Sequence, residues 1–372
     1  MASSYVCSTA AAVRSAAAAD PPTIDVTEYE RRCDETLARA GTPWVAVYGD
    51  REHSANLLFL TGFDPRFEEA LLLLGPAKRR VLLVGNEGIV HAVVAGLPLE
   101  IELCQGFSLM GQPRESTPRL DRALDGLGLV SAGQVGVVGW KYLSGSESDD
   151  PSRPAWAPAV IVDSLRCVTG TDPIDVTAVL MDPGEGLRAR NSSDQIAAFA
   201  WAALRASQAV FRVVRGVRPG MTERDAAALM GYAGEPLSMH PIVASGARGQ
   251  PINGLRSPSG RQVAIGDGIS CGIGYWGSLC CRAGLVEDAA GIDMTGSGST
   301  GDGIRAEDER DARHARRRTR AFPQLLHESL GQPPLHPAVR RVLVGVAQLL
   351  GDHVDRRWGA REAIANLLDQ YG

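Results

Sequence analysis

The sequence predicts an α/β domain followed by an α+β domain, with a helical segment at the end. Three observations predict this organisation. Short apolar runs alternate with helical patterns over residues 24–183, which is typical of a sheet covered by helices. A long helical pattern begins near residue 193 and gives way to strand-like runs after residue 239. The length of 372 residues corresponds to two or three domains of about 150 residues.

The first domain is expected to contain short buried strands, because its apolar runs are bounded by Gly, Pro or charged residues. The expected helices cover residues 29–40, 87–95 and 119–127, and the expected strands cover residues 44–48, 70–74, 80–84, 101–104, 134–138 and 159–162. Residues 144–158 are rich in Ser, Asp and Pro and are expected to form a surface loop.

The second domain is expected to open with a long helix from Ser193 to the breaker cluster at 216–220. Its predicted buried face consists of Ile196, Phe199, Ala200, Ala203, Val210 and Val214. Thr222, with Asp225 three residues later, is expected to cap a second helix that extends to about residue 232. Strands are expected over residues 241–244, 263–265 and 269–273.

The last part of the chain changes in composition. Residues 295–303 are Gly- and Ser-rich, residues 305–320 are densely charged, and two amphipathic helical patterns follow. The predicted division of the chain is a disordered tail (1–23), the first domain (24–183), a partial second domain (184–294), a linker with a charge run (295–320) and a helical tail (321–372).

Composition excludes several classes of protein. The net charge of −5 argues against a general nucleic-acid binder, and no apolar run reaches the ~20 residues of a membrane span. The Ala- and Ser-rich start lacks the basic and apolar regions of a signal peptide. Seven scattered cysteines without an export signal indicate reduced thiols. We therefore expect a cytoplasmic protein.

Five segments in the same order resemble the creatinase and aminopeptidase P family. They are residues 51–70, residues 187–196, residues 217–223, Gly266-Asp267, and the Gly-Tyr-Trp-Gly sequence at 274–277. The resemblance extends over about residues 25–290. It implies a ribonuclease-H-like first domain and a pita-bread second domain, a homodimer, and cleavage of amino-terminal Xaa-Pro bonds or a related C–N bond.

The same resemblance implies a site of two divalent metals such as Mn, Co or Zn, held by two Asp, one His and two Glu. Counted from Asp267, the first aspartate position is Gly272. The second falls near 278–282, and no carboxylate occurs between Gly268 and Val286. No segment after residue 290 resembles the one that supplies the His and the two Glu. We therefore expect no bound metal and no other cofactor.

Three other sites are possible from the residue types alone. Residues 272–277 match G-x-G-x-x-G, although no helical pattern follows, so a glycine-bearing β turn is favoured over a dinucleotide loop. His240 with Cys271, Cys280 and Cys281 could form a soft metal site, or the thiols could be buried. Cys281 and His240 could form a nucleophilic pair only if the fold brings them together.

Two hypotheses for function remain. The first is a metal-free, non-catalytic homologue that binds a small molecule or peptide, and the alternative is an active hydrolase of Xaa-Pro peptides or a related C–N bond. The candidate substrate-binding residues are His240, Arg248, Arg256 and Arg282. The three arginines could bind a carboxylate, although a solvated surface position is favoured for each. His53 and His91 are expected to be structural.

Overall fold

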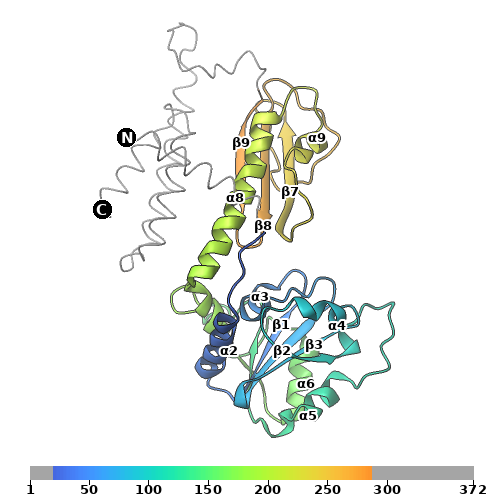
Figure 1. The fold of residues 1–372 in the computed structure, drawn as a ribbon, viewed down its shortest axis with the longest axis vertical. Coiled ribbons are helices and arrows are strands. Elements are labelled where there is room, and N and C mark those ends of the chain that lie inside the picture. The colour runs from blue at the N-terminus through green and yellow to red at the C-terminus, as the bar shows by residue number, and fades with distance from the viewer. Residues whose placement is uncertain (1–19, 287–372) are drawn as a thin grey trace, which may run out of the picture. The chain divides into compact units, whose positions relative to one another are not determined.

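The computed structural model describes residues 20–286. The predictions for the amino-terminal tail up to residue 19, the linker with its charge run and the helical tail lie outside the described residues. Residues 20–198 form one compact unit, and the described residues from Phe199 onward belong to a second (Figure 1). Within residues 20–286, no helix is both long and apolar enough to cross a membrane.

A six-stranded mixed sheet forms the centre of the first unit, in the order β4-β3-β2-β1-β5-β6. Its strands β1, β2 and β3 are labelled in Figure 1. The strands are β1 (Trp44–Gly49), β2 (Ala70–Gly75), β3 (Arg79–Val84), β4 (Glu100–Leu103), β5 (Val135–Val138) and β6 (Ile174–Asp175). Strand β2 is antiparallel to β1 and β3, whereas β3 and β4, β1 and β5, and β5 and β6 pair in parallel. All strands except β2 therefore end at the same edge of the sheet.

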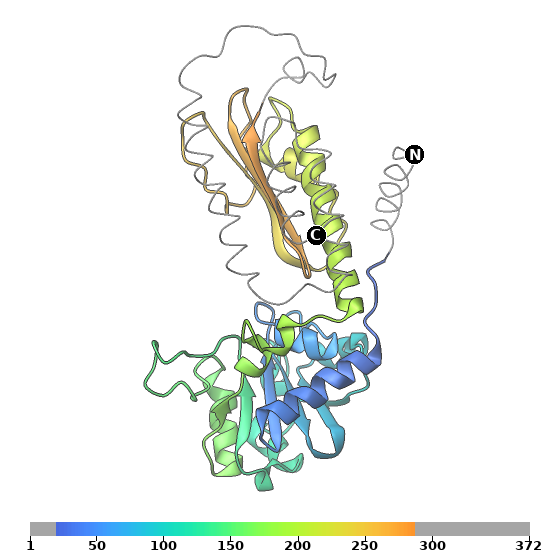
Figure 2. The ribbon, with the colours of Figure 1, turned by 90° about the vertical axis from the view of Figure 1, so that its left-hand side faces the viewer.

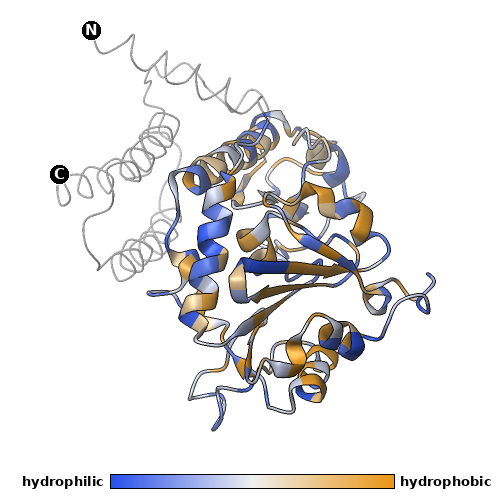
Figure 3. Cartoon of the chain, turned by 60° about the horizontal axis from the view of Figure 1, so that its bottom comes forward, coloured by the Kyte–Doolittle hydropathy of each residue, from blue (hydrophilic) through white to orange (hydrophobic). Residues whose placement is uncertain are grey.

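Helices cover both faces of this sheet. They are α2 (Val26–Ala40), α3 (Ala55–Thr61), α4 (Gly88–His91), α5 (Leu120–Gly126), α6 (Ala159–Thr169) and α7 (Ala178–Met181), with 3-10 turns at Pro76–Lys78, Ala92–Val94, Gln105–Phe107, Leu129–Ser131 and Leu187–Ala189. One face packs on α2 and α3 and the other on α5 and α6. The strands are largely hydrophobic (Figure 3), which explains why each of the three central strands β1, β2 and β3 reads as a continuous apolar run.

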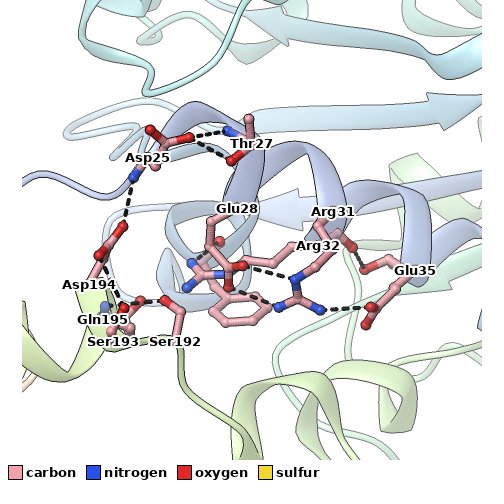
Figure 4. A network of polar contacts seen from close by, with 12 residues as sticks. Asp25, Thr27, Glu28, Arg31, Arg32, Glu35, Ser192, Ser193, Asp194 and Gln195 are labelled. Atoms are coloured by element: carbon pink, nitrogen blue, oxygen red, sulfur yellow. Dashed lines mark hydrogen bonds and ion pairs between the residues drawn. The ribbon is translucent and has the colours of Figure 1, made fainter.

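Helix α2 is fixed to the unit by polar contacts at its start and by a buried arginine (Figure 4). The Asp25 side chain caps the helix, and the Asp25 backbone N–H donates to Asp194 Oδ2 at 3.2 Å. Arg32 is 1% exposed. It donates to Glu28 and to the Phe59 carbonyl, both at 2.8 Å, and its guanidinium carbon lies 4.1 Å from the centre of the Phe59 ring. These contacts join α2 to α3 and to the start of α8.

The prediction of a strand over residues 159–162 was wrong, because these residues begin helix α6. Ile161 and Leu165, four residues apart, are both fully buried, whereas Val160 is 58% exposed. This spacing is that of one helical face. Three of the four residues at 159–162 are β-branched, which is typical of a strand. Packing of this segment against α5 nevertheless favours the helix. The other strands and helices predicted for this unit are confirmed within a few residues.

Asp175, on edge strand β6, is expected to destabilise the first unit at neutral pH. Its Oδ1 accepts from the Thr177 N–H at 2.8 Å, but its Oδ2 is buried without a hydrogen-bond partner in the described structure. Burial raises the pKa of Asp175 to about 6. A raised carboxyl pKa stabilises the folded state at low pH, and this contribution is lost as the pH rises from about 4 through 6.

Asp175→Asn should therefore raise the free energy of unfolding by about 1 kcal/mol at pH 7.5, with the gain disappearing near pH 4. Urea unfolding followed by circular dichroism at both pH values measures this difference. Asp125→Asn, at an exposed position, is the control and should change stability little at either pH. An Asp175→Asn variant that is less stable than the parent at pH 7.5 would contradict the prediction.

Among the described residues up to 286, the second unit contains a three-stranded antiparallel sheet and two helices, and Figure 2 shows the long helix beside the sheet. Its elements are α8 (Ser193–Gly216), which begins within the first unit, α9 (Glu223–Ala228), β7 (Leu237–Gly246), β8 (Gly268–Tyr275) and β9 (Cys280–Leu285). The strand order is β7-β8-β9. Small residues on α8, including Ala202, Ala206 and Ala209, pack against the sheet residues Ile273 and Tyr275. One sheet face is thereby buried under the helices.

The sequence predicted the start and end of α8, but of the predicted buried face only Val210 is fully buried. Phe199 and Val214 are 37% and 54% exposed, whereas Ala202, Ala206 and Val213 are buried. Alanine side chains allow a helix to approach a sheet closely, and Ala202 and Ala206 pack in the same core as Val210 and Val213. The predicted strand at 263–265 was also wrong, because these residues belong to the loop between β7 and β8.

The predicted Thr222–Asp225 capping box is confirmed, although α9 ends at Ala228 rather than near residue 232. The glycine-bearing turn occupies only the end of the predicted stretch 272–277. Gly272 and Gly274 are within strand β8, and the turn to β9 is at Gly277, where φ is +89°.

Candidate functional site

The position that the family resemblance assigns to the first metal-binding aspartate is buried in the middle strand of the second sheet. Gly272 on β8 lies opposite Ile242 on β7 and Cys281 on β9. A Cβ atom added at Gly272 would lie 2.7 Å from Cys281 Sγ and 3.2 Å from Met239 Cε. Side chains from the neighbouring strands therefore occupy the space that a carboxylate at this position would need.

The two carboxylates that precede this strand already have other partners. Glu223, at the start of α9, is 0% exposed and accepts from the backbone N–H groups of Ser245 at 2.7 Å and Ser259 at 2.9 Å, and from Arg256 at 2.7 Å. Asp267 accepts from Arg261 at 2.7 Å and from the backbone N–H of residue 264 at 2.8 Å. Both acids hold the loop between β7 and β8 in place.

The pKa values of these acids follow from the same contacts. Burial raises the pKa of Glu223, but hydrogen bonds from Ser259 and Ser245 outweigh burial and lower it to about 2. The Arg261 guanidinium lowers the pKa of Asp267. Both groups are therefore ionised at neutral pH. Their negative charges are already compensated by Arg256 and Arg261 in the folded loop.

The donors around Gly272 do not fit the expected pair of metals. Mn and related hard divalent cations prefer carboxylate oxygen, whereas the side chains at this position offer a thiol and a thioether. Burial raises the pKa of the Cys271 thiol to about 11, which disfavours the thiolate that a metal would bind. Within residues 20–286, no three His, Cys, Asp or Glu side chains gather closely enough to hold a metal ion.

The four predicted binding residues occupy different parts of the second unit. His240 is exposed on β7, with Nε2 3.3 Å from the Ser257 hydroxyl. Arg256 is ion-paired with the buried Glu223. Arg248 is exposed in the loop after β7, and the exposed Arg282 on β9 donates to the Cys281 carbonyl at 2.8 Å. The structure gives no contact between His240 and Cys281.

A cavity that the sequence did not reveal lies in the first unit. It has a volume of about 550 Å³ and is located where β1 and β4 end, β2 begins, and helices α5 and α6 start. Its lining residues are Tyr48, Glu69, Gly106, Phe107, Arg114, Thr117, Pro118, Arg119, Leu120, Pro158, Val160 and Ile161. Ligands of α/β proteins commonly bind beyond the carboxyl ends of the strands. The strands were predictable, but the order that brings these loops together was not.

A polar cluster adjoins this cavity through Tyr48. The Tyr48 hydroxyl donates to Asp50 at 3.0 Å, and His53 Nδ1 lies 3.0 Å from the same carboxylate. The His53 ring stacks on Trp140, with ring centres 4.4 Å apart. Burial of the Tyr48 side chain and the Asp50 charge raise the pKa of Tyr48, so its hydroxyl remains a donor. His53 thus holds the loop after β1, as expected of a structural residue.

Comparison with known proteins gives a fold but no close relative. No protein-family model matches the chain, and no curated protein sequence matches it. A recombinant prolidase from Thermococcus sibiricus is similar in structure, with a TM-score of 0.51 and 18% identity over 71% of this chain and 66% of that one.

Two further solved structures are similar to the chain. A prolidase from Pyrococcus horikoshii OT3 has a TM-score of 0.49 and 18% identity, over 70% of this chain and 65% of that one. Proline aminopeptidase P II from Yersinia pestis has a TM-score of 0.48 and 15% identity, over 71% and 64%. The chain spans slightly less than two thirds of the length of each of these three proteins. The Thermococcus sibiricus match confirms the predicted resemblance at the level of the fold.

Proposed function

We propose that the chain is a metal-free, non-catalytic homologue of the Xaa-Pro peptidases that binds a small molecule or peptide. The observation that carries this proposal is the filled position at Gly272, where the Cys281 thiol and the Met239 methyl group occupy the space of the expected aspartate. Binding two divalent cations close together needs several carboxylates to offset the repulsion between the ions.

The remaining acids of this region do not compensate for the missing aspartate. Glu223 and Asp267 are both buried and hydrogen-bonded within the β7–β8 loop. Releasing either one to a metal would leave buried N–H groups and an arginine without their partner, which costs several kcal/mol.

For ligand binding we retain His240, Arg248 and Arg282, which are exposed. Arg256 is less suited, because its charge already neutralises Glu223. The homodimer and the cytoplasmic location stay predictions.

The purified full chain, dialysed against buffer with Mn²⁺, is expected to retain less than about 0.1 metal ion per chain by elemental mass spectrometry, and not to hydrolyse a dipeptide of the Xaa-Pro type. An active prolidase assayed in parallel is the control for the assay. Two bound ions per chain together with turnover that a chelator abolishes would contradict the proposal and establish the alternative, an active hydrolase.

A further inference from the structure

The cavity of the first unit has an apolar floor that is already formed. Tyr48, Phe107, Leu120 and Ile161 line it, and all four are buried members of the core on the α5 and α6 side of the sheet. Their positions are fixed by packing, so a ligand would not have to order them. A preformed apolar surface of this kind binds the hydrocarbon part of a small molecule at low entropic cost.

The loop on one side of the cavity is held by its own hydrogen bonds. Gln105, which is 6% exposed, donates through Nε2 to Asn86 Oδ1 at 3.0 Å and accepts from the Ser116 N–H at 2.7 Å. The Gln105 backbone N–H donates to the Thr117 hydroxyl at 2.9 Å. This network fixes the backbone that carries Arg114, and with it one wall of the cavity.

Arg114 brings to this wall a positive charge that no carboxylate neutralises among residues 20–286. Its guanidinium donates to the Gly106 carbonyl at 2.8 Å and more weakly to the Gln105 carbonyl at 3.4 Å. These bonds orient the group without cancelling its charge. The other arginine of the cavity, Arg119, differs because it pairs with Asp121 at 2.8 Å. Arg114 is therefore the group available to a ligand carboxylate.

Glu69 provides the opposite charge in the same cavity. It lies immediately before β2, it is exposed, and no described residue pairs with it or donates to it. A cavity built for a simple anion, such as a phosphate or a fatty acid, would be weakened by a carboxylate in its lining. An unpaired acid and an unpaired arginine around an apolar floor instead match a ligand that carries both charges.

From these features we infer that the cavity binds a small zwitterion with an apolar side chain, namely an amino acid or a dipeptide. Arg114 binds its carboxylate, Glu69 binds its ammonium group, and its side chain packs on Tyr48 and Phe107. The volume of about 550 Å³ admits a molecule of this size. The site lies in the first unit and uses no metal, so it is independent of whether the second unit is catalytic.

The test is isothermal titration calorimetry of the full chain at pH 7.5 in the presence of a chelator. L-phenylalanine and glycyl-L-phenylalanine are the two zwitterionic probes. The probe that binds with the lower dissociation constant shows whether the cavity prefers an amino acid or a dipeptide. 3-Phenylpropanoate lacks the ammonium group, and L-phenylalaninamide lacks the carboxylate. Each analogue should bind at least about tenfold more weakly than phenylalanine, since each loses one charge-assisted contact.

Variants locate the site. Val160→Trp fills the cavity from an exposed position on α6 and should weaken binding at least about tenfold, whereas Val130→Trp, at a similarly exposed valine outside the cavity, should leave it unchanged. Glu69→Gln should abolish the preference for phenylalanine over 3-phenylpropanoate, and Glu102→Gln on exposed β4 should not.

Failure of both zwitterions to bind, or binding that Val160→Trp leaves intact, would overturn the inference. Equal binding of 3-phenylpropanoate and phenylalanine to the parent chain would also overturn it.

Discussion

Replacing Gly272 by aspartate is expected to lower the free energy of unfolding of the second unit by about 3 kcal/mol or more and to create no metal site. Gly272 is buried in the middle strand, and a Cβ atom there would be 2.7 Å from Cys281 Sγ and 3.3 Å from the Cys280 carbonyl oxygen. The new side chain would displace the Cys281 thiol and the Met239 methyl group and press on the Cys280 carbonyl, and its carboxylate would lie beside the Met239 side chain.

Three further variants separate steric from electrostatic effects. Gly272→Ala introduces the clash without the charge and should cost less than Gly272→Asp. Cys281→Ala in the Gly272→Asp background removes the nearest atom and should restore part of the lost stability. Gly284→Asp on β9, where an added Cβ meets no atom within 4 Å, is the matched control and should change stability by less than about 1 kcal/mol. Urea unfolding measures all four. A Gly272→Asp variant as stable as the parent would contradict the packing argument.

Replacing Glu223 by glutamine is expected to destabilise the second unit by about 2–3 kcal/mol, the cost of leaving buried donors without an acceptor, since Glu223 is fully buried although its partner Arg256 is 38% exposed. Both carboxylate oxygens accept hydrogen bonds, one from Ser245 and Arg256 and the other from Ser259. A glutamine would turn an NH₂ group toward one of these sets of donors and leave them unpaired. Glu185→Gln, in an exposed ion pair with Arg190, is the control and should cost less than about 1 kcal/mol.

The pH dependence of this effect has a definite sign. Because the pKa of Glu223 falls from an ordinary value of 4.5 to about 2 on folding, the unfolded state binds the proton more readily. The stabilisation is complete above about pH 4.5 and is lost as the pH falls toward 2. The difference in unfolding free energy between the parent and Glu223→Gln should therefore shrink over this window. A difference that stays constant from pH 6 to pH 3 would show that charge is not the cause.

The sequence predicts most of the fold because its local patterns and its packing agree. The strands at 44–48, 70–74 and 80–84 are continuous apolar runs, and the structure buries them on both faces. Where the structure differs, packing overrides the pattern. The run at 159–162 is β-branched but lies in a helix. On α8 the small alanines face the sheet, whereas the larger Phe199 lies partly exposed.

The candidate site was predictable only in part. Sequence alone shows that residue 272 is a glycine where an aspartate is expected, but not that Cys281 and Met239 fill the space beside it. That fact depends on the register between β8 and β9. Similarly, Glu69 and Arg114 are 45 positions apart in the chain, and no local pattern relates them. Only the strand order brings both to the edge of one sheet.

The parallel pairing of β1 with β5 has a consequence for synthesis of the protein. Strand β1 forms an antiparallel meander with β2 and β3 within the first 84 residues, but residues 44–47 pair on their other side with residues 135–138. On the ribosome, the central strand β1 therefore keeps one open hydrogen-bonding edge after the meander has formed, until residues 135–138 have also emerged. During that interval the nascent chain presents an apolar edge that can pair with a strand of another chain, so misassembly competes with completion of the sheet.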